Sequence, residues 1–234
     1  MTAPVMVSAG YVVTRLAPRP TYVDAALLPP QLISASDCIA EFFPSFWALR
    51  EARVSEQDRA AAAAKFGITP HDLPKVIEYM TRARDRQELG WPRVWFSTQS
   101  AIAAIKRFLS VLDDVVLVGL GVPQDLADDF LAGAGPMDTS DICTMLRAGN
   151  PLASGGTPLG WEVVGYEFGG DFHSWLCNHI EKEAYARLGI RPGANGLIVC
   201  ENDARSILSL VGLDDVGAEP VPWFPLLFVQ YNIE

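Results

Sequence analysis

The spacing of apolar and polar residues along the chain predicts both strands and helices. Residues 114–123 (DVVLVGLGVP) are an almost unbroken apolar run, which is typical of a buried strand. Residues 11–24 alternate apolar and polar side chains ahead of their prolines, a pattern that favours an edge strand. Residues 93–97, 161–168 and 221–233 are rich in β-branched and aromatic side chains and are also expected to form strands.

Apolar residues at helical spacing, with capping residues beside them, predict helices elsewhere. Ser55 precedes a run of alanines that Gly67 ends, and a proline is tolerated in the first turn of the helix that opens near Asp72. Pro44 is expected to break or kink the first helix. The predicted helices are 36–51, 55–67, 72–88, 98–112, 123–133, 171–188 and 201–212.

These elements intermix without the regular alternation that a doubly wound sheet requires. We therefore predict the α+β class, with a small, mostly antiparallel sheet covered by helices and a helix-rich N-terminal half. No long linker or internal repeat divides the 234 residues, so residues 1–234 are expected to form a single globular domain. Residues 36–88 are a candidate helical subregion of that domain. Residues 133–160, rich in Gly, Pro, Ser and Thr, are the best candidate for a mobile or binding loop.

The composition narrows the function further. The formal net charge is −10, and Lys and Arg cluster only near residues 82–86, so the chain lacks the basic stripe that nucleic acid requires and would be repelled by anionic membranes. The longest apolar run is far below the ~20 residues of a membrane helix. The first 13 residues lack the features of a secretory signal. We expect a cytoplasmic protein with neither a nucleic-acid nor a membrane partner.

The cysteines are widely separated in the sequence. No C-x-x-C pair occurs among the four cysteines, Cys38, Cys143, Cys177 and Cys200. This spacing favours four reduced thiols and argues against a structural zinc site. The glycines of residues 119–123 follow a strand but lack the third glycine of a dinucleotide-binding turn. The sequence therefore predicts no metal and no cofactor.

His173 and Cys177 are the only residues that suggest a reaction centre. If residues 171–188 form one helix capped by Asp171, the two side chains lie four residues apart on one face and can meet. They would then form a thiolate–imidazole pair or two metal ligands of a small-molecule enzyme. Alternatively, both side chains pack in the helix interior, and we favour that interpretation because a nucleophilic cysteine normally lies at a helix N-terminus, whereas Cys177 is expected two turns inside.

Carboxylates and tryptophans supply the other candidates. An acidic surface suits a basic protein partner, because complementary charge speeds the encounter. Glu162 and Glu167 are expected on opposite faces of their strand, so they do not converge on a substrate. The candidate partner-binding residues are Asp125, Asp128, Asp129, Asp138, Asp141, Asp214, Asp215 and Glu219, with Trp175 and Trp223 as aromatic anchors.

The favoured hypothesis is a non-enzymatic, acidic, cytoplasmic protein that captures and neutralises a basic protein partner. Bacterial immunity proteins, which inhibit toxins, typify this class, although no motif in the sequence matches them. The alternatives are the small-molecule enzyme built around His173 and Cys177 and a structural subunit of a larger assembly. The oligomeric state is left open.

Overall fold

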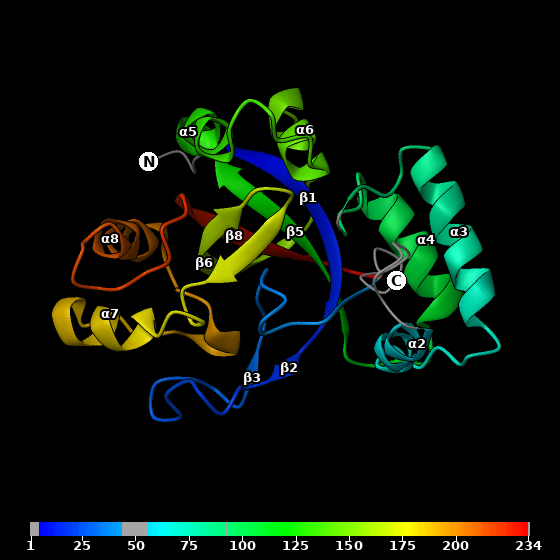
Figure 1. Ribbon diagram of the computed structural model, residues 1–234, viewed down its shortest axis with the longest axis horizontal. Helices are drawn as coiled ribbons and strands as arrows, with labels where there is room; N and C mark the ends of the chain where they lie inside the picture. The colour runs from blue at the N-terminus through cyan, green and yellow to red at the C-terminus, as the bar shows by residue number, and fades with distance from the viewer. Residues whose placement is uncertain (1–4, 44–55, 92, 234) are drawn as a thin grey trace.

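A six-stranded antiparallel sheet, curled into a half-barrel, runs through the centre of the computed structural model, which describes residues 5–43, 56–91 and 93–233 (Figure 1). Its strand order is β4-β1-β5-β8-β6-β7. The strands are β1 (Met6–Arg15), β4 (Phe42–Phe43), β5 (Val115–Pro123), β6 (Thr157–Glu167), β7 (Asp171–Ser174) and β8 (Trp223–Tyr231). A separate pair is formed by β2 (Ala17–Pro18) and β3 (Gln31–Leu32).

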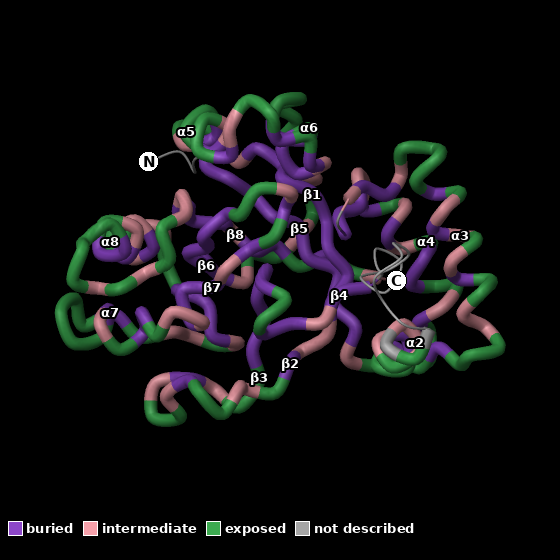
Figure 2. Tube along the Cα trace, in the orientation of Figure 1, coloured by how far each residue is buried: buried purple, intermediate pink, exposed green. Residues whose placement is uncertain are grey.

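Helices cover both faces of this sheet. They are α2 (Glu56–Ala64), α3 (Leu73–Asp85), α4 (Thr98–Phe108), α5 (Gln124–Ala134), α6 (Asp141–Ala148), α7 (Ile180–Leu188) and α8 (Glu201–Val211), with a short 3-10 turn, η1 (Ala194–Gly196). The strands are buried along most of their lengths, whereas the helices keep one side exposed (Figure 2). Burial on both faces explains why β5 is apolar throughout.

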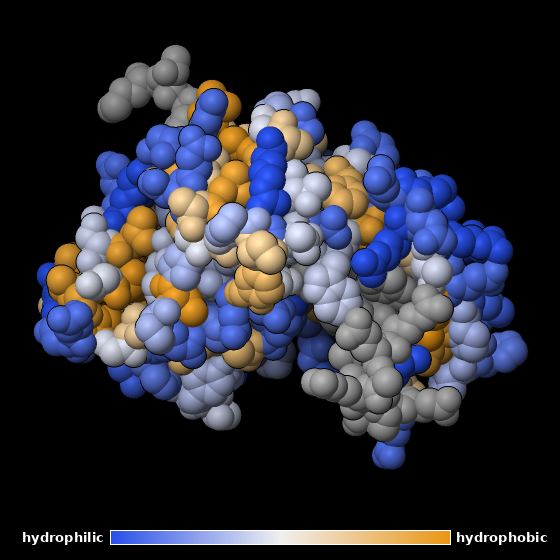
Figure 3. Space-filling view, turned by 45° about the horizontal axis from the view of Figure 1, so that its top comes forward, coloured by the Kyte–Doolittle hydropathy of each residue, from blue (hydrophilic) through white to orange (hydrophobic). Residues whose placement is uncertain are grey.

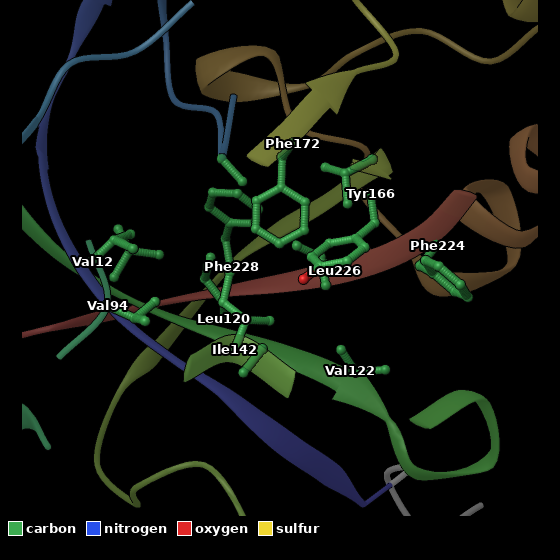
Figure 4. Close-up of a cluster of buried hydrophobic side chains, with 14 of the residues drawn as sticks. Val12, Val94, Leu120, Val122, Ile142, Tyr166, Phe172, Phe224, Leu226 and Phe228 are labelled. Atoms are coloured by element: carbon green, nitrogen blue, oxygen red, sulfur yellow. The ribbon is translucent and has the colours of Figure 1, made fainter. Parts of the chain in front are cut away.

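The alternation of side chains along each strand separates an inner core from two outer cores. Phe172, Tyr166 and Phe228 point into the same space on the inner face, where the Tyr166 and Phe172 rings lie 5.6 Å apart (Figure 4). On the outer face, α2, α3 and α4 pack on the β1–β5 side, and α7 and α8 pack on the β6 side. The inner core is closed by α5, α6 and residues 33–42, which we call the plug segment.

Two parts of the expected fold were wrong. The sheet is not small, because six strands span the molecule, and the N-terminal half is not helix-rich, because it opens with the ten-residue strand β1. Residues 36–43 form a turn and β4 instead of a helix. Phe42 packs in the inner core and Phe43 in an outer core. Consecutive side chains on opposite faces are the pattern of a strand. The rest of that predicted helix, Pro44 included, lies outside the described residues.

Other elements agree with the sequence pattern. The structure confirms α2, α3, α4, α5 and α8, and the strands β5, β6 and β8, close to their predicted positions. The expected strand 93–97 is reduced to isolated bridges that join Trp95 to Tyr11 and Leu89. The glycine-rich segment 133–160 contains α6, whose Ile142 and Leu146 are buried in the inner core. The organisation into one domain stays a prediction.

No helix in the described part of the chain has both the length and the apolar character needed to cross a membrane.

Candidate functional site

The single helix predicted for residues 171–188 does not form. Gly169 and Gly170 have φ values of +101° and +103°, so the chain reverses there and β7 pairs with β6 as a hairpin. Alternate residues of β7 then point inward and outward, and the helix α7 begins only at Ile180, after His179 in the left-handed conformation. The i, i+4 geometry expected for His173 and Cys177 is therefore absent.

His173 lies on the outer side of β7 between two carboxylates. Its Nε2 is 3.2 Å from Oε2 of Glu167, and its Nδ1 is 2.6 Å from Oε2 of Glu219. Both ring nitrogens can donate a hydrogen bond only when the imidazole is protonated. His173 thus links the β6–β7 hairpin to residues 212–222, and no described hydrogen bond or ion pair joins it to Cys177.

Cys177 lies in the turn between β7 and α7. Its Sγ contacts the Ser36 hydroxyl at 3.7 Å and the Tyr22 hydroxyl at 3.9 Å. Burial raises the pKa of the Cys177 thiol to about 11. A thiol that stays protonated near neutral pH is a poor nucleophile. The structure does not bring His173 and Cys177 together as a thiolate–imidazole pair.

Three segments meet at one end of the sheet: the β6–β7 turn, the loop after α5 and residues 212–222. The Tyr166 N–H donates to the Pro222 carbonyl at 2.8 Å, and the Gly169 N–H donates to Oδ2 of Asp138 at 3.0 Å. Asp138 is only 1% exposed and also accepts from the Tyr166 hydroxyl and the Ser140 N–H. Asp138 therefore anchors two loops and does not present its charge to a partner.

Hydrogen bonds control the charge of Asp138. Burial acts to raise the pKa of this carboxyl, but the bonds from Gly169, Ser140 and Tyr166 outweigh burial and lower it below the ordinary value. The Asp138 carboxylate therefore stays ionised inside the loop junction.

A surface hollow of about 470 Å³ lies beside this junction, between α8 and residues 212–222. Asp214 and Glu219 stand among its lining residues, and Trp223, Val221 and Leu208 supply apolar surface. Asp214 is exposed, and the Glu219 side chain is 44% exposed. We call this site the 214–223 hollow. It brings together three of the candidate partner-binding residues.

The remaining candidates lie elsewhere. Asp125 on α5 pairs with Arg205 of α8 at 3.0 Å, while Asp128 and Asp129 are exposed on α5. Asp215 pairs with Arg187 at 3.0 Å. These carboxylates are on the surface but outside the lining of the hollow.

The last two candidates are Asp141, which is half-buried, and the buried Trp175. Asp141, at the start of α6, accepts a hydrogen bond from the Trp91 N–H at 2.6 Å. Trp175 is fully buried in the core beneath α7 and α8, so it offers no surface to a partner in this structure. Trp223 is 8% exposed and is the tryptophan that borders the hollow.

Sequence reasoning missed two exposed apolar side chains at the same end of the sheet. Phe168, in the β6–β7 turn, is 65% exposed, and Met137, in the loop that Asp138 anchors, is 78% exposed. The position of Phe168 immediately before Gly169 and Gly170 could have predicted its exposure, because a residue at the tip of a hairpin lies away from the sheet. On the face that Figure 3 shows, hydrophobic side chains emerge in separate patches among hydrophilic ones.

Sequence reasoning also missed the role of Glu162, an acidic residue within the apolar strand β6. Its carboxylate is 1% exposed and accepts hydrogen bonds from the Ser34 and Ser174 hydroxyls, both at 2.6 Å, and from the Ala35 N–H at 2.7 Å. Burial raises the pKa of Glu162 to about 7, although these hydrogen bonds act against the rise. Glu162 thereby holds the plug segment against the inner face.

Arg93 holds the plug segment from the other side. Its guanidinium pairs with Asp37, donates to the Ala35 carbonyl at 3.2 Å and lies 4.5 Å from the centre of the Phe42 ring. Because the Arg93 side chain is only 5% exposed, we assign it, like Glu162, to the architecture of the inner core.

Within residues 5–43, 56–91 and 93–233, no group of three or more His, Cys, Asp or Glu side chains is placed to hold a metal ion.

The chain matches no known protein-family model, no curated protein and no solved structure.

Proposed function

We propose that this chain is a non-enzymatic, acidic, cytoplasmic protein that captures and neutralises a basic protein, as bacterial immunity proteins do. The 214–223 hollow is the observation that carries the proposal. Its lining combines the apolar surface of Trp223 and Val221 with the carboxylates of Asp214 and Glu219. A lysine or arginine side chain has the matching form, an aliphatic stem that ends in a cation.

Local charge supports a basic partner at this hollow. Asp215 is neutralised by Arg187 and Glu219 contacts His173, whereas Asp214 makes no ion pair within the described part of the chain. Together with the net charge of −10, an unpaired carboxylate in the lining attracts a cationic side chain and speeds association.

Phe168 gives the proposed surface an apolar contact. It lies in the turn that follows Tyr166, and the Tyr166 N–H is bonded to Pro222 of the loop that borders the hollow. An exposed aromatic side chain next to carboxylates is typical of interface anchors. In our proposal, Phe168 packs on the partner while the hollow receives its basic side chain.

The four cysteines support a cytoplasmic location. All of them are free in the structure, including the exposed Cys38 and Cys200, as is usual in a reducing compartment. Nucleic acids and anionic membranes are not part of the proposal, because the acidic surface repels phosphate groups.

The test is comparative capture from the native host. Tagged wild-type protein is compared with the double variant Asp214→Asn/Glu219→Gln and with the matched variant Asp85→Asn/Asp113→Asn, which removes two exposed carboxylates on the α3 and α4 side. We expect wild type and the matched variant to retain one basic protein at near-equal stoichiometry. With that protein purified, the hollow variant should associate roughly tenfold more slowly and with a weaker salt dependence.

Two results would contradict the proposal. One is a captured protein that binds all three versions at the same rate, which would place the contact elsewhere. The other is wild-type protein that elutes alone and monodisperse from the host extract.

A further inference from the structure

Two of the free cysteines share the same neighbours, Ser36 and Tyr22, at the edge of the plug segment. Ser36 accepts a hydrogen bond from the Cys38 N–H at 3.2 Å, and its hydroxyl contacts Sγ of Cys177 at 3.7 Å. These two contacts place the Cys38 nitrogen within about 7 Å of the Cys177 sulfur, so the two cysteines are neighbours through Ser36. Tyr22 also contacts both cysteines: its hydroxyl lies 3.3 Å from the Cys38 carbonyl oxygen and 3.9 Å from Sγ of Cys177.

The other cysteines have no such neighbour among the described residues. Cys143 is buried, and its sulfur lies 3.5 Å from the Tyr166 hydroxyl. Cys200 is exposed just before α8. The fold therefore brings together one exposed thiol, Cys38, and one half-buried thiol, Cys177, from positions far apart in the sequence.

We propose that Cys38 and Cys177 are a redox modification site, at which a reversible intramolecular disulfide ties the plug segment to the β7–α7 turn. This inference is independent of the partner-binding proposal. The oxidant class is a low-molecular-weight disulfide such as glutathione disulfide, which suits a compartment where protein disulfides are transient.

The chemistry is two successive thiol–disulfide exchanges. The Cys38 thiolate attacks one sulfur of glutathione disulfide, forms a mixed disulfide and releases one glutathione thiolate. The Cys177 thiolate then attacks the Cys38 sulfur, forms the internal bond and releases the second glutathione. The two protons lost by the protein thiols end on the two glutathione molecules, and the two cysteines are oxidised while glutathione disulfide is reduced.

The surroundings of the two thiols set this order. Cys38 is exposed and is reached first by the oxidant. Burial, with a smaller contribution from the neighbouring Cys38, raises the pKa of Cys177 to about 11, so the second exchange is the slow one near neutral pH. Its rate should rise about tenfold for each pH unit until that pKa is approached.

The experiment uses the full native chain. Wild type, Cys38→Ser, Cys177→Ser and Cys200→Ser are incubated with glutathione disulfide, alkylated and digested without reduction, and the peptides are identified by mass spectrometry. We expect wild type and Cys200→Ser to give a peptide that joins Cys38 to Cys177 and has lost two hydrogen atoms. Cys177→Ser should stop at glutathionylated Cys38, and Cys38→Ser should give no internal cross-link.

A second measurement follows the rate of the internal cross-link between pH 7 and 9, where we expect the tenfold rise per unit. The proposal is overturned if wild type accumulates glutathionylated Cys38 without the internal bond. It is equally overturned if the only disulfides join separate chains, or if the Cys38–Cys177 peptide appears only after unfolding in urea.

Discussion

Glu162 and Asp138 are two carboxylates that are equally hidden from solvent, at 1% exposure each, but burial affects them in opposite ways. Each accepts hydrogen bonds from three residues, yet the pKa of Glu162 is raised to about 7 and that of Asp138 is lowered. The number of donors therefore does not decide the outcome.

The surroundings of the two groups decide it. The partners of Glu162 are themselves 0–1% exposed, so its charge lies deep in the protein. Asp138 lies between Met137 and the β6–β7 turn, where Phe168 reaches solvent. The closeness of Asp138 to the molecular surface reduces the penalty of burying its charge, and the hydrogen bonds then prevail. The exposure of a residue alone does not reveal this difference, whereas its closeness to exposed residues such as Met137 and Phe168 does.

The largest effect expected from this comparison is that of Glu162→Ala. The substitution leaves the Ser34 and Ser174 hydroxyls and the Ala35 N–H without their acceptor in a dry core. We expect a loss of about 4 kcal/mol in the free energy of unfolding, because each buried unpaired donor costs about 1–3 kcal/mol. Urea denaturation at pH 5 measures it.

Glu162→Gln is the control for that loss. Its amide oxygen still accepts from the Ala35 N–H, and its amide group donates to the serine hydroxyls, so less than half of the loss is expected. Equal stability of Glu162→Ala and wild type would show that the plug segment does not depend on Glu162.

The second largest expected effect is on the pH dependence of stability, to which Glu162 and Asp138 should contribute in opposite directions. Between pH 4.5 and about 7 the folded state keeps a proton on Glu162 that the unfolded chain releases, so the stabilisation is complete below pH 4.5 and is lost as the pH rises to 7. The change is roughly 3 kcal/mol. Asp138 acts in the opposite direction: its contribution is present above its unfolded pKa of 3.8 and is lost as the pH falls through its lower folded pKa.

Denaturation curves of wild type and Glu162→Gln across pH 4.5–8 give the measurement. The difference between the two proteins removes the titration of all other groups. It should fall by roughly 3 kcal/mol between pH 4.5 and 7, so that Glu162→Gln becomes the more stable protein at high pH. A difference that stays constant would mean that Glu162 has an ordinary pKa in the folded protein.

Asp138→Ala should have a smaller effect than Glu162→Ala. It also removes the acceptor of three donors, those of Ser140, Tyr166 and Gly169, but water can reach the vacated position from the nearby surface. We expect a loss of about 2 kcal/mol in the free energy of unfolding at pH 5, the pH used for Glu162→Ala. A loss as large as that of Glu162→Ala would show that the two sites are equally dry, contrary to the comparison.

Much of the fold could be predicted where one pattern dominates a segment. The unbroken apolar run predicts the strand β5, and the helical spacing of apolar residues predicts α4 and α8. In each segment the intrinsic propensity of the residues and their burial favour the same structure. The prediction of one helix over residues 171–188 was wrong because it gave more weight to the helix-forming residues after Asp171 than to the turn at Gly169 and Gly170. Pairing with β6 overrides local propensity, and the sequence does not reveal that partner strand.

The candidate site was predictable only in part. Asp214, Glu219 and Trp223 were selected as acidic or aromatic residues near the C-terminus, and the structure brings them to one hollow. Trp175 and Asp138 were selected for the same reasons but are buried. Trp175 packs in the core beneath α7, and Asp138 lies at the junction of two loops. Glu162 could be placed on one face of β6, but its donors come from residues 34, 35 and 174, which only the fold brings close.

The plug segment has a consequence for how the chain is made. Ser34 reaches its acceptor across 128 residues, and every partner of β1 in β5 lies at or beyond Val115. A ribosome adds about 5–20 residues per second, so the first forty residues wait on the order of ten seconds before Glu162 emerges. Until β5 emerges within that interval, β1 is a ten-residue, mostly apolar strand without that partner, which is the moment when a chaperone is most useful to this protein.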